Sequence, residues 1–172
     1  MEKRKFGNTG LAVSRLTFGC GAVGGLMTKG DARDQDRAIG WARDHGINFF
    51  DTAASYGNGV SEENLGRALQ GNSDGLVIST KVGLSNDDLS DVYGAITRSL
   101  DASLARLGLD HVDIFQLHNT LGRTDFRGTL TIDQIMDAVV PAFDKLRDSG
   151  KVRFLGFTAK GEADDVHKLV SC

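Results

Sequence analysis

The sequence contains few cysteines, a single proline and no long apolar run. Its 172 residues include two cysteines, Cys20 and Cys172, and one proline, Pro141. Two cysteines provide neither a disulfide framework nor the spacing of a metal site, so we expect no metal and a reducing, cytoplasmic location. No apolar run approaches the roughly 20 residues that span a bilayer. The start, "MEKRKFGN", is not followed by the apolar core of a secretory signal, and we expect no membrane association.

Net charge is also small. The chain carries 20 basic and 23 acidic residues, for a formal net charge of −3. This balance gives no electrostatic reason to expect nucleic acid or an anionic membrane as a partner. Glycine, in contrast, is abundant, with 22 residues, which is typical of many tight turns around regular elements. The length predicts one domain over residues 1–172, with a hairpin within residues 1–14.

Short apolar runs alternate with helical patterns along the chain. Each run is rich in β-branched or aromatic residues, as strands are, and each helical pattern places apolar residues on one face. We expect Ser61 to cap one helix, Gly108 to end another and Pro141 to lie in the first turn of a third. The predicted strands are residues 16–18, 47–50, 76–79, 112–117 and 152–157; the predicted helices are residues 34–45, 61–69, 92–107, 141–150 and 162–170.

This alternation predicts a parallel sheet covered by helices, in one of two architectures. The first is a doubly wound, Rossmann-type sheet. "GCGAVG", residues 19–24, matches the G-x-G-x-x-G pattern after a strand, and Asp51 ends the next strand, where a ribose-binding acid would lie. Against this, the motif requires a helix that opens at its last glycine, and Gly30 interrupts any helix before Asp34.

The second architecture, a (β/α)8 barrel, explains more of the polar residues. Asp51, Lys81 and His118 end the second, third and fourth predicted strands. The carboxyl ends of parallel strands lie at one edge of a sheet, and (β/α)8 barrels have their active sites there. Tyr56 follows Asp51 in a glycine-rich loop and can fold back over this edge. The sequence therefore predicts that these four side chains meet in a functional site.

Each of these residues also has an ordinary structural interpretation. Asp51 alone is typical of a helix cap or a turn, Lys81 of a solvated loop and His118 of a hydrogen-bonded structural histidine. Tyr56 alone is typical of a loop anchor. The functional interpretation depends on the joint pattern, in which three consecutive strands all end in ionisable groups.

Five stretches of the sequence carry a family resemblance, in the order "FGNTGLAVSRLTFGCG", "GINFFDTAASYGNGVSEENLGRAL", "STKVG", "SLARLGLDHVDIFQLH" and "GKVRFLGFT". In these stretches the chain resembles the first part of an aldo-keto reductase. It implies a (β/α)8 barrel that binds NADP(H), with NAD(H) as the alternative, and an enzyme that reduces small-molecule aldehydes or ketones to alcohols. A phenol is a slow proton donor near neutrality, and a neighbouring ammonium favours the phenolate.

The resemblance assigns a role to each residue of the predicted site. Tyr56 is the general acid, Lys81 lies beside the phenol, Asp51 is the counter-charge of Lys81, and His118 orients the carbonyl. Gly21, Ala22, Asp51 and Thr158 are implied near the cofactor. The family often has a serine–asparagine pair after its fifth strand, where this chain has Thr158 and Ala159.

The length differs from that of a complete barrel of this family. Such barrels take roughly 250 residues, so we expect residues 1–172 to form about the first five βα units only. The loops that hold the cofactor's phosphates in the family would then lie outside these residues. Two alternatives follow: an oxidoreductase, or a partial barrel without independent catalysis that acts as an assembly module or is a fragment. Five strands would have two unpaired edges, through which we expect self-association.

Overall fold

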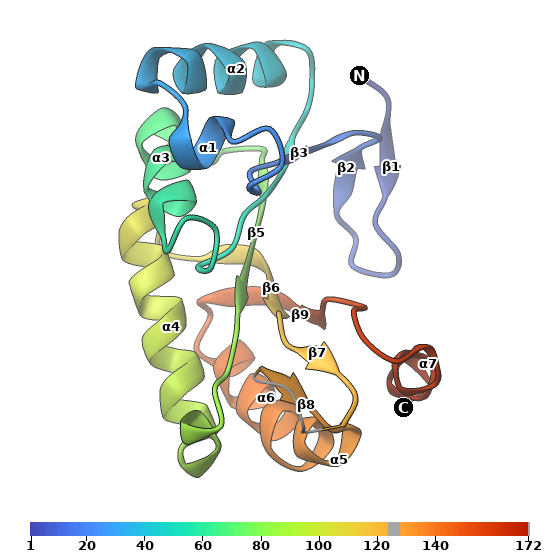
Figure 1. Ribbon diagram of the computed structural model, residues 1–172. Coiled ribbons are helices and arrows are strands. Elements are labelled where there is room, and N and C mark those ends of the chain that lie inside the picture. The colour runs from blue at the N-terminus through green and yellow to red at the C-terminus, as the bar shows by residue number, and fades with distance from the viewer. Residues whose placement is uncertain (124–127, 172) are drawn as a thin grey trace.

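A parallel sheet forms the centre of the fold (Figure 1). The computed structural model describes residues 1–123 and 128–171, so Cys172 lies outside the described part. The sheet has the order β3-β4-β5-β6-β9, and each neighbouring pair is parallel. This confirms the α/β fold with a parallel sheet. Its strands are β3 (Thr17–Gly19), β4 (Phe49–Asp51), β5 (Val77–Val82), β6 (Val112–Leu117) and β9 (Val152–Phe157).

The strand order excludes the Rossmann-type alternative. A doubly wound sheet reverses its strand order at a switch point, whereas these five strands are neighbours in the order in which the chain forms them. The glycine motif also does not open a helix at its last glycine. Gly24 and Gly25 both have left-handed backbone, with φ of 79° and 70°, and the helix that follows, α1 (Leu26–Lys29), has only four residues. The Rossmann-type alternative for residues 19–24, which Gly30 already disfavoured, is therefore excluded.

Successive residues of each strand face two different hydrophobic clusters, because side chains alternate between the faces of a sheet. One set packs against the helices, and the other forms a smaller cluster on the inner face. The first set contains Phe50, Ile78 and Phe115, and the second contains Phe49, Val77 and Ile114.

An N-terminal hairpin covers one end of the inner face. Its strands, β1 (Lys3–Lys5) and β2 (Ala12–Ser14), pair in antiparallel fashion. The side chain of Asn48, just before β4, accepts from the backbone N–H of Ser14 at 2.7 Å and donates to the carbonyl of Ala12 at 2.9 Å. The hairpin is therefore tied to the amino end of the strands, and the carboxyl ends lie on the other side.

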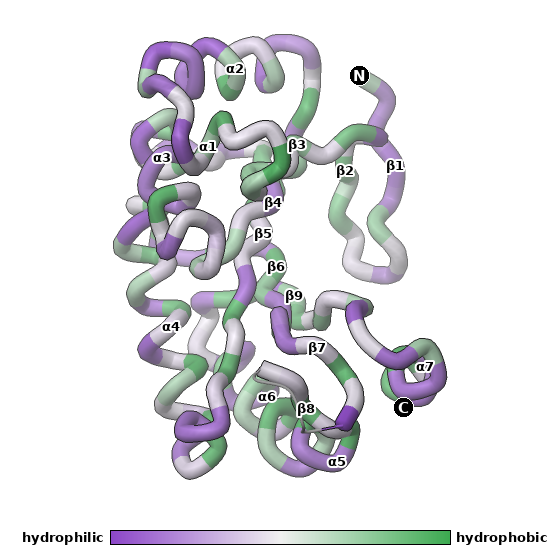
Figure 2. Tube along the Cα trace, viewed as in Figure 1, coloured by the Kyte–Doolittle hydropathy of each residue, from purple (hydrophilic) through white to green (hydrophobic). Residues whose placement is uncertain are grey.

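Most helices pack on the outer face of the sheet, whereas the last helix, residues 163–170, has no buried residue. Figure 2 shows hydrophilic and hydrophobic residues alternating along α4, as an amphipathic helix requires. Gly108 ends this helix in the left-handed conformation, as predicted, with φ of 66°. Among the described residues, no helix is both long and apolar enough to cross a bilayer. The longer helices are α2 (Ala32–Asp44), α3 (Val60–Leu69), α4 (Val92–Leu107), α6 (Val140–Asp148) and α7 (Ala163–Val170), with a short 3₁₀ helix, η1 (Asp87–Ser90), before α4.

Ser61 does not cap α3, contrary to the prediction. The N-cap residue is Gly59, and the side chain of Ser61 lies fully buried in the first turn. Its hydroxyl donates to the carbonyl of Cys20 at 2.8 Å and lies 2.9 Å from the hydroxyl of Thr52. Ser61 thus joins α3 to the residues that follow β3 and β4.

The segment between β6 and α6 contains more regular structure than its composition suggests. Two short parallel strands, β7 (Thr120–Leu121) and β8 (Thr129–Leu130), pair with each other. Thr131 then forms a capping box with Gln134, which starts helix α5 (Ile132–Gln134). A π-helical segment, η2 (Ile135–Val139), leads into α6. Pro141 lies in the first turn of α6, as predicted, although the helical residues of α5 and η2 directly precede it.

Helices α3 and α4 approach closely at Gly66. A Cβ atom added there would lie 2.5 Å from the carbonyl oxygen of Arg106. This oxygen belongs to the backbone of α4, which cannot move without separating the two helices. We therefore expect Gly66→Ala to lower the free energy of unfolding by about 1–3 kcal/mol, measured by urea denaturation.

Gly40 provides the matched control for this substitution. It lies inside α2, and no heavy atom is within 4 Å of an added Cβ. Gly40→Ala should stabilise the protein by about 0.5–1 kcal/mol, since alanine loses less backbone entropy in a helix. Equal effects of the two substitutions would contradict the close approach at Gly66.

Candidate functional site

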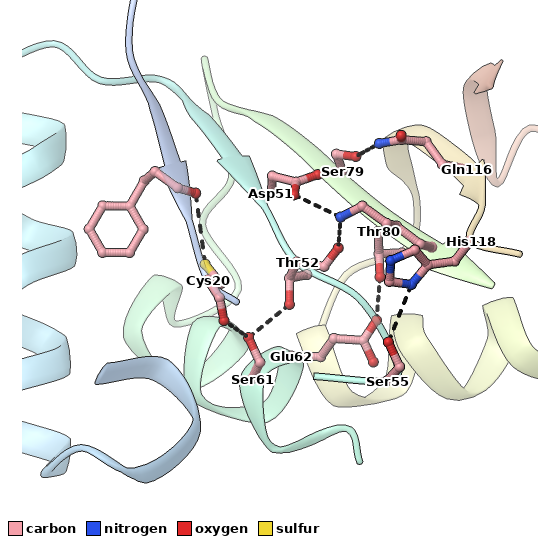
Figure 3. A network of polar contacts seen from close by, with 12 residues as sticks. Cys20, Asp51, Thr52, Ser55, Ser61, Glu62, Ser79, Thr80, Gln116 and His118 are labelled. Atoms are coloured by element: carbon pink, nitrogen blue, oxygen red, sulfur yellow. Dashed lines mark hydrogen bonds and ion pairs between the residues drawn. The ribbon is translucent and has the colours of Figure 1, made fainter. Parts of the chain in front are cut away.

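Three strand ends bring the predicted side chains to one edge of the sheet. Asp51 is the last residue of β4, Lys81 lies near the end of β5, and His118 directly follows β6. Asp51 pairs in register with Ser79, two residues before Lys81, and Lys81 pairs with Gln116, two residues before His118. Because residues two apart in a strand share a face, the side chains of Asp51, Lys81 and His118 lie on the same face of the sheet. Figure 3 shows Asp51 and His118 directed towards the same region.

Lys81 is buried and bound to Asp51. Its ammonium lies 2.7 Å from a carboxylate oxygen of Asp51 and donates to the carbonyl of Thr52 at 2.7 Å. The side chain of Lys81 is 5% exposed, against 27% for Asp51. A buried ammonium requires such a counter-charge to remain protonated. Asp51 therefore holds the Lys81 ammonium in place at the carboxyl end of β5.

Tyr56 lies beside this pair. The Lys81 ammonium nitrogen is 5.0 Å from the centroid of the Tyr56 ring. The ring of His118 meets the Tyr56 ring edge-on, with centroids 5.8 Å apart and an interplanar angle of 83°. A Cβ added at Gly21 would lie 3.6 Å from the Tyr56 ring, so the loop after β3 passes close to this ring. The phenol predicted from sequence therefore lies beside Lys81 at the end of β5 and His118 directly after β6, close to the loop after β3.

The surroundings of His118 favour its neutral form. Burial, followed by the positive charges of Lys81 and Lys160, lowers the pKa of His118 below its ordinary value, and the negative charge of Asp51 opposes this shift. The hydroxyl of Ser55 lies 3.3 Å from Nδ1 of His118 (Figure 3). A neutral imidazole carries a single N–H, so one nitrogen donates and the other accepts.

Cys20 lies in the same region, but its thiol is unreactive. Burial, and then the charge of Asp51, raise the pKa of Cys20 to about 12. The thiol therefore stays protonated and is not a nucleophile. Within residues 1–123 and 128–171 there is also no group of three or more histidine, cysteine or acidic side chains that would hold a metal ion.

The residues implied near the cofactor surround the same region. Gly21 lies close to the Tyr56 ring, and the next residue, Ala22, is exposed. The backbone N–H of Thr158 donates to the carbonyl of Leu117 at 2.8 Å, which places Thr158 level with the end of β6. The hydroxyl of Thr158 is buried and has no hydrogen-bond partner in the described part of the chain. A buried hydroxyl without a partner is costly, so this residue fits a ligand that supplies a polar group.

Several contributing residues escaped prediction. Thr52 supplies a carbonyl to Lys81, and Ser55 contacts His118. Asn119 is buried, and its side chain accepts from the N–H of Leu84 at 2.9 Å and donates to the carbonyl of Leu84 at 2.7 Å. Asn119 thus fastens the loop after β6 to the loop after β5. No local pattern in the sequence reveals these contacts, because each joins segments that are distant along the chain.

Comparison with known proteins identifies the family. The model of the aldo/keto reductase family matches residues 15–171. L-galactose dehydrogenase of Arabidopsis thaliana is 37% identical over 161 residues, which cover 92% of this chain and 48% of that protein. An aldo-keto reductase of Bacillus subtilis is 32% identical over 163 residues, covering 91% of this chain and 46% of that protein. The chain spans about half the length of these curated relatives.

Solved structures agree with this result. The holo form of an aldo-keto reductase from Bacillus halodurans superposes with a TM-score of 0.74 at 30% identity, covering 92% of this chain and 50% of that one. An aldo-keto reductase from Klebsiella pneumoniae in complex with NADPH has a TM-score of 0.74 at 27% identity, covering 99% of this chain and 53% of that one. The chain belongs to the aldo/keto reductase family, and its parallel sheet corresponds to part of the TIM-type barrel of that family.

Proposed function

We propose that these residues form the proton-transfer half of a carbonyl reductase that uses NADP(H), with NAD(H) as the alternative cofactor. The observation that carries the proposal is the enclosure of Tyr56 by the Lys81–Asp51 ion pair and the ring of His118. The bound cofactor would supply a hydride to the carbonyl carbon. The complex of the Klebsiella pneumoniae relative with NADPH supports this cofactor.

Each side chain then has a distinct task. Tyr56 donates its phenolic proton to the carbonyl oxygen, on which negative charge develops as the carbon is reduced. The Lys81 ammonium stabilises the phenolate that remains, and Asp51 keeps this ammonium charged and in place. Neutral His118 donates a hydrogen bond to the carbonyl oxygen and orients it. The products would be an alcohol, the oxidised cofactor and a phenolate, which is reprotonated from solvent.

An assay of NADPH consumption with aldehydes and ketones tests this function. It should be run on residues 1–172 and on the longest reading frame that contains them. Turnover in the longer form only would favour the second interpretation of residues 1–172, a partial barrel without independent catalysis. If neither form bound NADPH and neither form consumed it, the proposal would be contradicted.

Thr158 offers a prediction for cofactor binding. If its buried, unpartnered hydroxyl accepts or donates a hydrogen bond to the cofactor, Thr158→Val should weaken NADPH binding by about threefold to tenfold, the effect of one neutral hydrogen bond. Thr158→Ser, which keeps the hydroxyl, should bind NADPH as the parent does. The measurement is a fluorescence titration with NADPH, and unchanged affinity in Thr158→Val would remove this residue from the proposed cofactor site.

The unpaired sheet edges remain a separate proposal. Within the described residues, β3 and β9 each pair with one strand of the sheet only. Such edges favour pairing with another chain. Sedimentation of residues 1–172 tests whether the protein associates with itself.

A further inference from the structure

Ser55 connects the loop that carries Tyr56 with the strand that carries His118. It directly precedes Tyr56 in the loop between β4 and α3, and its hydroxyl lies 3.3 Å from Nδ1 of His118. Figure 3 shows the two side chains in contact across the site. Tyr56 and His118 themselves touch only through their rings, at 5.8 Å between centroids. The hydroxyl of Ser55 provides a hydrogen bond between the loop that carries Tyr56 and His118 at the end of β6.

The charge state of His118 determines what this contact does. Four titratable groups face the imidazole: Asp51 from β4, Tyr56 from the following loop, Lys81 from β5 and Lys160 from the loop after β9. The two lysines and burial favour the neutral ring. A neutral ring is either the Nδ1–H or the Nε2–H tautomer, and the hydrogen bond at one nitrogen decides which is present.

We propose that Ser55 is a positioning residue, which donates its hydroxyl proton to Nδ1 of His118 and keeps the ring proton on Nε2. This inference rests on the proposed function, in which His118 must donate a hydrogen bond to a carbonyl oxygen. Because Nδ1 is occupied by the hydroxyl of Ser55, Nε2 is the nitrogen left to meet the substrate. The opposite tautomer would present a lone pair to the carbonyl and repel it.

The same contact sets the position of the phenol. The N–H of Tyr56 donates to the carbonyl of Ala53 at 3.0 Å, and the N–H of Asn58 contacts the carbonyl of Ser55 at 3.4 Å. These short-range bonds make a compact turn around Ser55, so fixing its hydroxyl on His118 also limits the movement of Tyr56. Proton donor and orienting imidazole are thereby held at one relative position.

The tautomer of His118 can be observed by ¹⁵N NMR at pH 7. The chain has four histidines, and the signals of His118 are identified by their loss in His118→Gln. The expected spectrum has a protonated Nε2 and an unprotonated Nδ1. A protonated Nδ1 in the parent protein would overturn the proposal, because Ser55 would then be an acceptor.

A titration of His118 in Ser55→Ala gives an independent readout. Loss of a donor to Nδ1 removes a hydrogen bond that favours the neutral ring, so the pKa of His118 should rise relative to the parent. If Ser55 instead accepted from Nδ1–H, its removal would destabilise the imidazolium, and the pKa of His118 would fall. An unchanged or lower value contradicts the proposal.

Kinetics complete the test. In an active form of the protein, kcat of Ser55→Ala should fall by about threefold to tenfold, the effect of one neutral hydrogen bond, with NADPH affinity unchanged. Ser55→Thr keeps the hydroxyl and should restore most of kcat. Ser149→Ala is the control, because this serine is also exposed and its hydroxyl is hydrogen-bonded near the amino end of β9, where it donates to the carbonyl of Leu146 and accepts from the N–H of Lys151. An unchanged kcat in Ser55→Ala would overturn the proposal; a parent protein that reduces no carbonyl would instead refute the proposed function, and the NMR result would still decide the role of Ser55.

Discussion

Tyr56→Phe is expected to abolish carbonyl reduction while leaving NADPH affinity nearly unchanged. A positioned general acid contributes about 10²–10⁴-fold to a rate, and the phenylalanine ring cannot donate a proton. The aromatic contacts of residue 56 with His118 and Lys81 are made by its ring, so the variant keeps them. Because the phenolic proton is required in the transition state, the loss should fall on kcat. The measurement is steady-state kinetics combined with an NADPH titration.

The second tyrosine of the chain is the matched control. Tyr93 lies on α4, is 42% exposed, and its ring centroid lies 5.6 Å from the ammonium nitrogen of Lys145. Tyr93→Phe should therefore leave kcat unchanged. Turnover of Tyr56→Phe within about tenfold of the parent would show that another group supplies the proton, since a general acid contributes more than that.

The strands and the site edge could be predicted because they depend on local patterns and on one rule of topology. Apolar runs of β-branched and aromatic residues marked the five strands. Parallel pairing then required Asp51, Lys81 and His118 to lie at one edge, and the structure places them there. Side-chain alternation explains why the three side chains face the same way, since residues two apart in a strand share a face.

Contacts between distant segments could not be predicted in this way. The sequence pattern at Ser61 and Glu62 is typical of a helix start, where a serine hydroxyl caps the helix and the helix dipole stabilises a carboxylate. In the structure both are fully buried. Glu62 accepts from the hydroxyl of Thr80, next to Lys81 in β5, and pairs with Arg106 of α4 at 2.7 Å. The polar pattern of a helix start is the same whether its side chains face solvent or another element.

The segment after β6 shows a related limit. No strand or helix was predicted between residues 118 and 140, yet β7 and β8 pair within this segment and Thr131 caps helix α5. Two-residue strands are too short to have a hydrophobic period. Asn119, which holds this segment to the loop after β5, is polar and buried, and only the tertiary contact identifies it as structural.

Lys81→Met should reduce kcat by at least about 10²-fold, comparable to the loss of a transition-state hydrogen-bond donor in other enzymes. Methionine keeps much of the length and volume of the side chain but removes the charge that stabilises the Tyr56 phenolate. The substitution also leaves the carboxylate of Asp51 without its partner at 2.7 Å. We therefore expect a loss of about 1–3 kcal/mol in the free energy of unfolding, less than for a fully buried pair because Asp51 keeps part of its exposure.

The double variant separates the chemical loss from the structural one. Lys81→Met combined with Asp51→Asn has no unpaired carboxylate, so its free energy of unfolding should exceed that of Lys81→Met alone, while its kcat stays low. Lys151→Met is the matched control, because the ion pair of Lys151 with Asp101 at 2.6 Å is exposed; this variant should change stability by less than about 1 kcal/mol and leave kcat unchanged. If the double variant recovered activity together with stability, Lys81 would be a structural residue only, and the charge beside Tyr56 would have no part in proton transfer.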